Sequence, residues 1–365
     1  MMAPEWVGGA MTTRRMTTRN GFATAAFLTI LVHAVWLLVG VVAIAPAAAA
    51  DWIYKAPPAA PDWSYKAPPA PSTYTSDFGM RFWYGSGKTG KTLFDDTGAL
   101  TVSRLSYDGI SIFTGEGFAR FDLSSGWFLK GYAGGGALLD GQLKDEDFPP
   151  VVAPYSATLS PIKNSSMSYG SADLGFKFVR GGDFYIGAFA GYHFMRQSVS
   201  AYGCTQVAGN PDICVPSIPD AYKVISQNNN WHSLRLGIDA AVELNRRWKL
   251  SVDAAWLPYV WLDGADAHWL RIGTSPGDFT GPVPEDGHGW GYQIDGFLSY
   301  RVNDFFSVGL GGRYWHMQAN GHTHFENHVV GVAAVPQVVN WKTDNYGVFL
   351  QSSVKLGPQG LLGGQ

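Results

Sequence analysis

Alternation between bulky apolar residues and small or polar residues runs through most of the chain, and this pattern limits the fold more than any other feature. In WKLSVDAAWLPYVWL (248–262), Leu250 and Val252 occupy one phase, and Lys249 and Asp253 occupy the other. Because successive side chains of a strand point to opposite faces, this period of two indicates β-strands. Lysine and aspartate in mid-strand suit a polar lumen, with the apolar face turned toward lipid.

The connections between these segments alternate in length. Short connections are centred on Ser124–Ser125, Gly181–Gly182, Asn245–Arg246 and Asn303–Asp304. Long connections cover roughly 93–99, 139–165, 200–227, 263–286 and 320–340. In outer-membrane barrels the short turns are periplasmic and the long loops are extracellular. The sequence therefore predicts an all-β fold, a ten-stranded antiparallel transmembrane β-barrel with long extracellular loops and both ends of the barrel segment on the periplasmic side.

Composition agrees with this interpretation. Charged residues make up 15% of the chain and aromatic residues 14%, and the mean hydropathy is −0.03, which excludes a bundle of membrane helices. A net charge of −3 leaves no broad basic surface, so we expect no nucleic-acid partner. A soluble lectin-like sandwich shares this composition, but it does not require long and short connections to alternate.

The amino-terminal part has the pattern of an export signal. Arg14, Arg15 and Arg19 precede an apolar segment, and the small residues 47–50 suit signal peptidase. We therefore predict a signal peptide over 1–50 and localisation to the cell outer membrane. The apolar segment is also long enough to be an uncleaved anchor.

Three further segments complete the predicted organisation. Residues 51–72 contain the imperfect repeat DWIYKAPPAAP/DWSYKAPPAPS, which predicts a periplasmic linker rich in proline and alanine. Residues 73–357 would form the barrel, and residues 358–365 a carboxy-terminal tail. Cys204 and Cys214 are close in sequence, and in an exported protein they could form a disulfide or remain two free thiols.

Two polar clusters fall in predicted outward connections. Asp145 and Asp147 follow the third strand, and Asp266 and His268 follow the seventh. Because both strands run outward, we expect the two pairs at the same rim, facing each other across a narrow barrel. His268 could take a proton from a water molecule, while Asp266 would fix the imidazole tautomer. One of the two neighbouring aspartates could stay protonated and stabilise an oxyanion. Surface aspartates that occur together by chance are the alternative.

Several stretches of the chain resemble the omptins, a family of ten-stranded outer-membrane proteases. The resemblance is carried by SGKT (86–89), VSRLSYDG (102–109) and GGDFYIGAFAGYHFMRQSVSA (181–201), and it extends over about 76–356. It implies an aspartic-type endopeptidase of a Gram-negative outer membrane, with the family's Asp-x-Asp pair at Asp145 and Asp147 and its Asp-x-His pair at Asp266 and His268. It also implies a peptide or protein substrate and no metal or organic cofactor. Outer-membrane lipids would be partners, with lipopolysaccharide as an activator bound at Tyr192 and Arg196.

The chain departs from the omptin pattern where the family binds a basic substrate side chain. Acidic residues of that pattern fall on Lys91 and Gly264, so we expect Lys91 to line the substrate cleft and to repel arginine. Asp263, together with Asp95 or Asp96, could compensate in part. Phe194 also stands where the lipopolysaccharide-binding pattern has an acidic residue.

Other readings of the chain remain open at this stage. A non-catalytic adhesin or structural surface protein would keep the loops without the chemistry, whereas a porin-like channel is disfavoured by a narrow ten-stranded lumen. GSGKTGKT (85–92) matches a phosphate-binding loop, but no helical pattern follows it. His322, His324 and His328 could ligate a metal ion, but a polar surface loop is the preferred interpretation, and His288 has no evident partner.

Overall fold

The computed structural model describes residues 74–148 and 153–357. The predicted signal peptide (1–50), the linker (51–72) and the tail (358–365) lie outside the described residues. Within the described part, almost every element is a β-strand, and the one short helix is η1 (Trp269–Arg271). No helix in these two ranges is long and apolar enough to cross a membrane.

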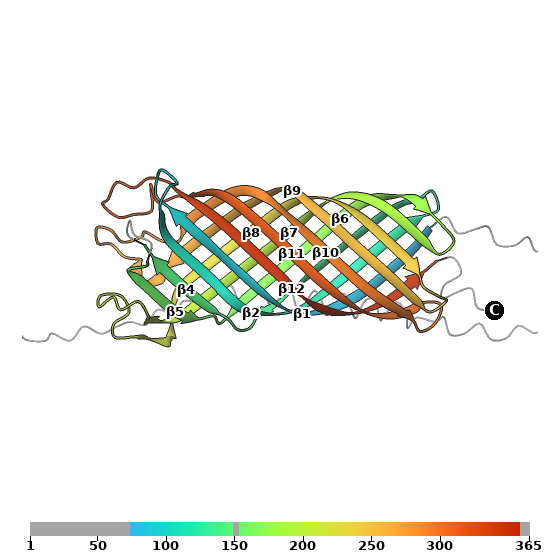
Figure 1. Cartoon of the computed structure of the whole chain (residues 1–365), viewed down its shortest axis with the longest axis horizontal. Helices are drawn as coiled ribbons and strands as arrows, with labels where there is room; N and C mark the ends of the chain where they lie inside the picture. Colours follow the sequence, from blue (N-terminus) through green and yellow to red (C-terminus); the bar gives the residue numbers. More distant parts are fainter. Residues whose placement is uncertain (1–73, 149–152, 358–365) are drawn as a thin grey trace, which may run out of the picture. The chain divides into compact units, whose positions relative to one another are not determined.

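Most of the strands are long, and short turns join them at one end of the barrel (Figure 1). Their bounds are β1 (Tyr74–Phe94), β2 (Thr101–Leu123), β3 (Trp127–Leu138), β4 (Gln142–Asp147), β5 (Ser156–Pro161), β6 (Ser165–Arg180), β7 (Phe184–Gln206), β8 (Ile218–Glu243), β9 (Trp248–His268), β10 (Val283–Arg301), β11 (Phe306–Thr323) and β12 (Gln337–Leu356).

Ten of these strands form a closed antiparallel ring, as the sequence predicts. Each pairs with its neighbour in the order β1-β2-β3-β6-β7-β8-β9-β10-β11-β12, and β12 pairs again with β1. The closing register runs from Ser76↔Leu356 to Leu93↔Val339. The strands are strongly tilted relative to the barrel axis (Figure 1), which is the geometry that closing a sheet into a barrel requires.

The two ends of the barrel differ in the length of their connections. The end that carries the residues 124–126, 181–183, 244–247 and 302–305 has short turns, at the four places where the sequence predicts them, and we call it the turn end. The other end, which we call the loop end, carries connections at 95–100, 139–164, 207–217, 269–282 and 324–336. Three of these loops are shorter than predicted, because β7, β8, β9, β10 and β11 continue past the expected strand ends.

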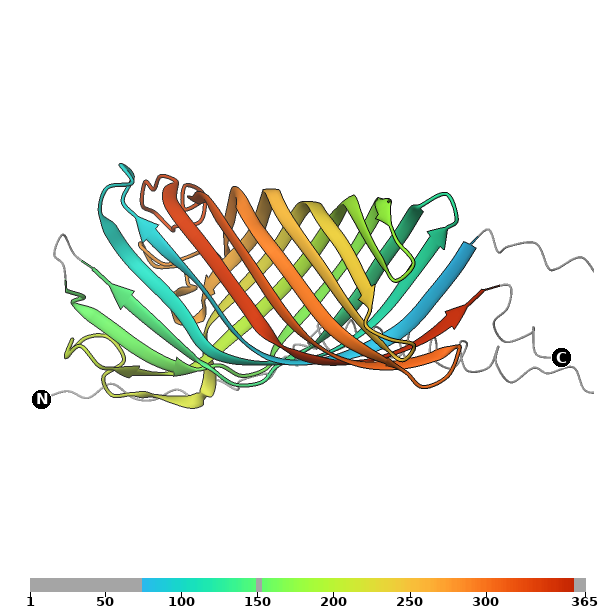
Figure 2. The same ribbon diagram turned by 45° about the vertical axis from the view of Figure 1, so that its right-hand side comes forward.

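The structure corrects the prediction of a loop over 139–165. It contains the strands β4 and β5, which pair with each other and raise the number of strands to twelve. β4 also pairs with the first part of β2, and β5 with the last residues of β7. This hairpin therefore extends the barrel wall at the loop end, where Figure 2 shows it beside the start of β2.

Apolar side chains cover the middle of the outer wall. Because the side chains of a strand alternate, β9 exposes Trp248, Leu250 and Val252 while Lys249 and Asp253 point inward. Aromatic residues mark both edges of this surface, as in membrane barrels. We call the surface the apolar band; towards the loop end it ends at Tyr84, Phe113, Tyr192, Trp261, Trp290 and Tyr346.

The middle of the lumen is filled by aromatic rings and ion pairs, which we call the lumen plug (residues Trp83, Tyr132, Tyr169, Trp315, Arg313, Glu116, Arg81 and Asp295). Arg313 donates to Glu116 at 2.7 Å and to Asp295 at 2.7 Å, while Arg81 donates to the other oxygen of Glu116 at 2.7 Å. The ring of Trp315 lies 5.0 Å from that of Tyr169. These buried charges are paired, which is the condition for tolerating them in a low dielectric.

Between the plug and the turn end lies a cavity of about 340 Å³ lined mostly by charged residues. Within it, Lys130 and Arg120 each donate to Asp239 at 2.9 Å. The plug therefore separates this cavity from the loop end of the lumen.

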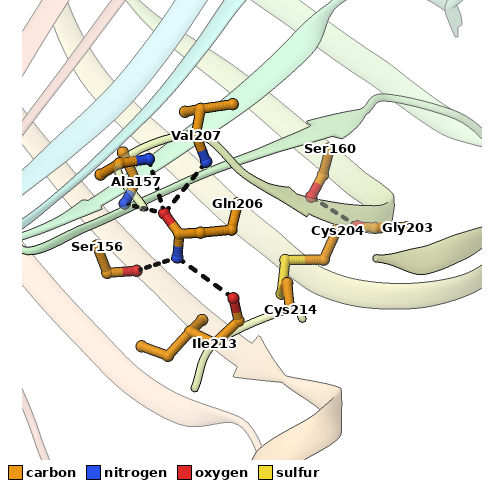
Figure 3. The surroundings of a disulfide bond; sticks show 10 residues. Ser156, Ala157, Ser160, Gly203, Cys204, Gln206, Val207, Ile213 and Cys214 are labelled. Atoms are coloured by element: carbon orange, nitrogen blue, oxygen red, sulfur yellow. Dashed lines mark hydrogen bonds between the residues drawn. A yellow bond between two sulfur atoms is a disulfide. The ribbon is translucent and has the colours of Figure 1, made fainter. Parts of the chain in front are cut away.

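A disulfide joins Cys204 and Cys214 and closes the connection between β7 and β8 (Figure 3). The side chain of Gln206 links this loop to the hairpin: its amide donates to Ser156 Oγ at 3.0 Å and to the carbonyl of Ile213 at 3.3 Å, and its oxygen accepts from the backbone N–H of Ala157 at 3.0 Å. The disulfide-closed loop and the β4–β5 hairpin thus form one hydrogen-bonded unit.

Candidate active site

Four strands bring polar side chains into the lumen at the loop end. Lys91 comes from β1, Asp145 from β4, Asp266 and His268 from β9, and Glu285 from β10. Asp266 stands five residues beyond Trp261, which is about 17 Å along the strand from the edge of the apolar band. The cluster therefore lies outside the part of the wall that would cross a membrane.

Asp266 and His268 are two residues apart at the end of β9, so both side chains point into the lumen. His268 Nδ1 lies 3.2 Å from Asp266 Oδ2, and the side chain of His268 is 24% exposed. Burial alone would lower the pKa of His268, but the carboxylates of Asp266 and Asp145 outweigh it and raise the pKa. His268 is thus oriented by a carboxylate and still open to solvent.

Asp145 and Asp147 occupy alternate positions of β4, opposite Leu105 and Ser103 of β2. Burial raises the pKa of Asp145 to about 6, against the opposing charge of His268. Burial also raises the pKa of Asp147, again opposed by His268. The predicted Asp pair is therefore within electrostatic reach of His268.

The expectation that Lys91 repels a basic substrate remains a prediction, and the structure shows which groups its ammonium contacts. Its side chain is buried, and its ammonium donates to Asp266 Oδ2 at 2.9 Å and to Glu285 Oε1. Burial alone would lower the pKa of Lys91, but the carboxylates of Asp266 and Glu285 raise it. Its charge is therefore compensated twice within the protein.

Sequence reasoning missed Glu285, the partner of Lys91. Its buried carboxylate also accepts hydrogen bonds from Gln227 Nε2 at 2.7 Å, Thr323 Oγ1 at 3.1 Å and Trp341 Nε1 at 3.2 Å. Together with Lys91, four donors therefore surround its two oxygens. The alternation of side chains could have identified it: Glu285 is two residues from the inward-facing Val283, so both side chains point into the lumen.

A second missed residue is Tyr107 of β2, whose side chain is buried. Among the described residues its hydroxyl has no hydrogen-bond partner, and the same holds for Asp145 Oδ1 and Asp266 Oδ1. Burial, and then the charges of Asp266, Asp145 and Glu285, raise the pKa of Tyr107 well above its ordinary value. Tyr107 is thus a neutral donor that faces the carboxylates.

The structure also corrects the expectation that Asp263 could compensate for the missing acidic residues. It stands three residues before Asp266, so it lies on the opposite face of β9, and it is exposed on the outer wall. Asp95 cannot replace it, because its carboxylate accepts from the backbone N–H of Ala99 at 2.9 Å and of Leu100 at 3.1 Å within the first loop. Neither residue compensates for a missing acidic group in the lumen.

Tyr192 and Arg196 lie on the outer wall, near the loop-end edge of the apolar band. Tyr192 is 49% exposed, and its hydroxyl is hydrogen-bonded to His232 Nδ1. The ring of His232 stacks on Trp261, with 5.1 Å between the ring centres. Arg196 is exposed in β7, opposite Asn230 of β8. One basic residue therefore stands beside an aromatic surface.

The histidines of the last loop do not gather around a common point. His324 uses both ring nitrogens, with Nε2 bonded to Asp286 at 2.5 Å and Nδ1 to Glu326 at 2.8 Å. The rings of His322 and His324 are 6.5 Å apart. In residues 74–148 and 153–357 no group of three or more His, Cys, Asp or Glu residues is placed to hold a metal ion.

Two other sequence features have structural explanations. The stretch 85–92 lies within β1, and the next element along the chain is the strand β2. His288 is exposed on β10, with its ring centre 5.5 Å from that of Tyr259.

Comparison with solved structures shows the fold. The chain is similar to the outer membrane protease OmpT from Escherichia coli, with a TM-score of 0.60 and 15% identity, over 79% of this chain and 97% of that one. It is also similar to the outer membrane protein OprG from Pseudomonas aeruginosa, at a TM-score of 0.32 and 8% identity over 78% and 97% of the two chains. No family model and no curated protein matches the sequence. The fold is therefore that of an outer-membrane β-barrel.

Proposed function

We propose that this chain is an omptin-like outer-membrane endopeptidase in which His268 activates water, with its loops facing the outside of the cell. The observation that supports the proposal most directly is that Asp266 contacts His268 while the charge of the same imidazole acts on both Asp145 and Asp147 at the loop end. The OmpT protease shares this fold at 15% identity, which supports the barrel and leaves the chemistry to the site itself.

The proposed first step is proton transfer from water to His268. An imidazole that donates from Nδ1 to Asp266 keeps the lone pair of Nε2 for a water molecule. The hydroxide that forms attacks the carbonyl carbon of the scissile peptide bond. The carboxylate of Asp266 then stabilises the imidazolium, which can return the proton to the leaving amine.

The negative oxygen that forms on the attacked carbonyl needs hydrogen-bond donors. Protonated Asp145 and the Tyr107 hydroxyl are proposed for this role, because both are buried and face the same cluster. When His268 is neutral and Asp145 is protonated, the two groups together carry one titratable proton, which is on Asp145. The active form is therefore one of two arrangements of a singly protonated site, the other being imidazolium with ionised Asp145.

Lipopolysaccharide is proposed as a partner at the outer wall. Tyr192 and His232 offer an aromatic surface and Arg196 offers a cation, beside the edge of the apolar band where lipid headgroups would lie. Because β7 and β8 continue from this surface to the disulfide-closed loop, bound lipid would order the strands that support the hairpin.

The decisive test is digestion of an unbiased peptide library by the refolded full-length protein with lipopolysaccharide. His268→Ala should lower the rate of cleavage by about 10²–10⁴-fold, the usual contribution of a general base. His324→Ala is the matched control, since its ring lies at the same end but bonds to Asp286 and Glu326.

Circular dichroism would confirm the barrel in each protein. Equal cleavage by wild type and His268→Ala would overturn the mechanism. No cleavage by any folded protein would overturn the endopeptidase proposal and favour an adhesin or structural surface protein.

A further inference from the structure

Lys91 is a buried cation placed inside the proposed catalytic cluster. Its strand, β1, pairs with β2 and β12, yet its ammonium reaches across the lumen to Asp266 of β9 and Glu285 of β10. Its side chain is only 6% exposed. A lysine buried this deeply requires compensating charges, and here both come from strands that do not neighbour its own.

The two carboxylates that hold Lys91 differ in how they are supported. Glu285 retains hydrogen bonds from Gln227, Thr323 and Trp341 even without the lysine. Asp266 retains only His268, since Oδ2 is shared between His268 and Lys91 and Oδ1 has no partner among the described residues. Glu285 therefore anchors Lys91, and Lys91 in turn fixes the carboxylate of Asp266.

We propose that Lys91 is the resident cation of this carboxylate cluster: it positions Asp266 for His268 and occupies the place between Asp266 and Glu285 that would otherwise accept a positively charged substrate side chain. This inference rests on the proposed function. Lys91 is accordingly a positioning and specificity residue rather than a catalytic one.

The specificity follows from charge. With Lys91 present, the pair Asp266 and Glu285 has one bound cation in direct contact with both carboxylates. An arginine or lysine of a substrate would have to displace a covalently attached competitor, so we infer that an uncharged side chain is preferred there. Without Lys91, two buried carboxylates would face the cleft uncompensated and would favour a substrate cation.

The positioning role follows from the shared oxygen. Lys91 lies 2.9 Å from the same Asp266 Oδ2 that contacts His268, and its charge disfavours imidazolium. Removing the ammonium should raise the pKa of His268 and shift its titration to higher pH. Besides Lys91, the ionisable groups that interact with His268 are Asp266 of β9 and Asp145 and Asp147 of β4.

The test compares wild type with Lys91→Met and Lys91→Arg in the full-length refolded protein. Lys91→Met should increase cleavage beside lysine or arginine, relative to uncharged residues, by at least about tenfold, the factor that 1.4 kcal/mol represents. Added propylammonium should compete with those basic substrates, and Lys91→Arg should keep the wild-type preference. Lys88→Met is the matched control, because Lys88 lies on the same strand with its side chain 63% exposed.

The titration of His268, followed by NMR of the labelled imidazole, separates this inference from the proposed function. A higher pKa in Lys91→Met supports the positioning role whether or not peptides are cut. An unchanged His268 titration, or an unchanged preference in an active Lys91→Met protein, would overturn the inference. Absence of cleavage by the wild type, with the His268 shift present, would overturn only the endopeptidase proposal and the specificity that depends on it.

Discussion

The side-chain amide of Gln206 donates a hydrogen bond of 3.0 Å to Ser156 Oγ and so joins the disulfide-closed loop to the hairpin that carries the candidate aspartates. On that side β5 pairs with β7 through Thr158↔Gln206 and Leu159↔Thr205, and Ser160 Oγ donates to the carbonyl of Gly203 at 2.7 Å. The strand that carries Asp145 and Asp147 is held by β2 on one side, and the loop closed by Cys204 and Cys214 supports the other edge of the hairpin.

Removal of the disulfide should loosen the hairpin. In a Cys204→Ser, Cys214→Ser protein we expect the local opening free energy of 156–161 to fall by about 2 kcal/mol, the lower part of the usual range for a disulfide. Amide hydrogen exchange would measure it, with the β11–β12 pairing as internal control. Exchange that is unchanged in β5 would show that the loop does not support the hairpin.

The pH dependence of cleavage should be bell-shaped if one proton is shared between Asp145 and His268. Activity should rise as pH increases through about 6, where the doubly protonated site loses its first proton. It should fall again above the raised pKa of His268, where the second proton is lost. The optimum lies between these two values.

Asp145→Asn should convert this bell into a single rise. The amide donates a hydrogen bond at every pH, so the alkaline limb disappears, and the single rise follows the titration of His268, whose pKa no longer has the raising effect of the Asp145 carboxylate. The measurement is kcat/KM from pH 4 to 10, with Asp263→Asn on the outer wall as control. An alkaline limb that persists would exclude Asp145 as the proton donor.

Tyr107→Phe should lower the rate of catalysis without lowering the stability of the barrel. Loss of one oxyanion donor should lower kcat by about 10²-fold with little change in KM. Because the hydroxyl has no partner among the described residues, the free energy of unfolding should be unchanged or slightly higher. Tyr84→Phe, on the lipid-facing wall, is the control. A normal kcat would remove Tyr107 from the mechanism.

The lumen plug should prevent ion flow through the barrel. We expect no steady unitary current from the wild-type protein in planar bilayers, because aromatic rings and paired charges fill the middle of the lumen. Arg313→Ala, which leaves Glu116 and Asp295 without this partner, should lower the free energy of unfolding by about 3–5 kcal/mol. Arg247→Ala at the turn end is the control, and a conducting wild type would contradict the plug.

The part of the fold inside the apolar band could be predicted from the sequence. Lipid on one face of each strand and a polar lumen on the other require apolar and polar side chains to alternate. Beyond that band both faces of a strand meet water, and the alternation fades. Residues 218–227 are therefore predicted as part of a loop, although they belong to β8. The same reason hides the hairpin, whose strand β4 is mostly polar.

The candidate site was readable only in part. The spacing of Asp266 and His268 places them on one face, and the same rule would have put Asp263 on the other. The contact of Lys91 with Glu285 was not readable, because it crosses the lumen between strands far apart in sequence. Such contacts depend on strand tilt and stagger, which no local pattern records.

The register between β1 and β12 has a consequence for biogenesis. The first strand of the barrel is hydrogen-bonded along its length to the last one, so the edge of β1 stays open until β12 has been delivered. An exported chain would therefore have to be kept from pairing with other chains until its final strand arrives. Synthesis errors that remove β12 would yield a sheet with two free edges rather than a smaller barrel.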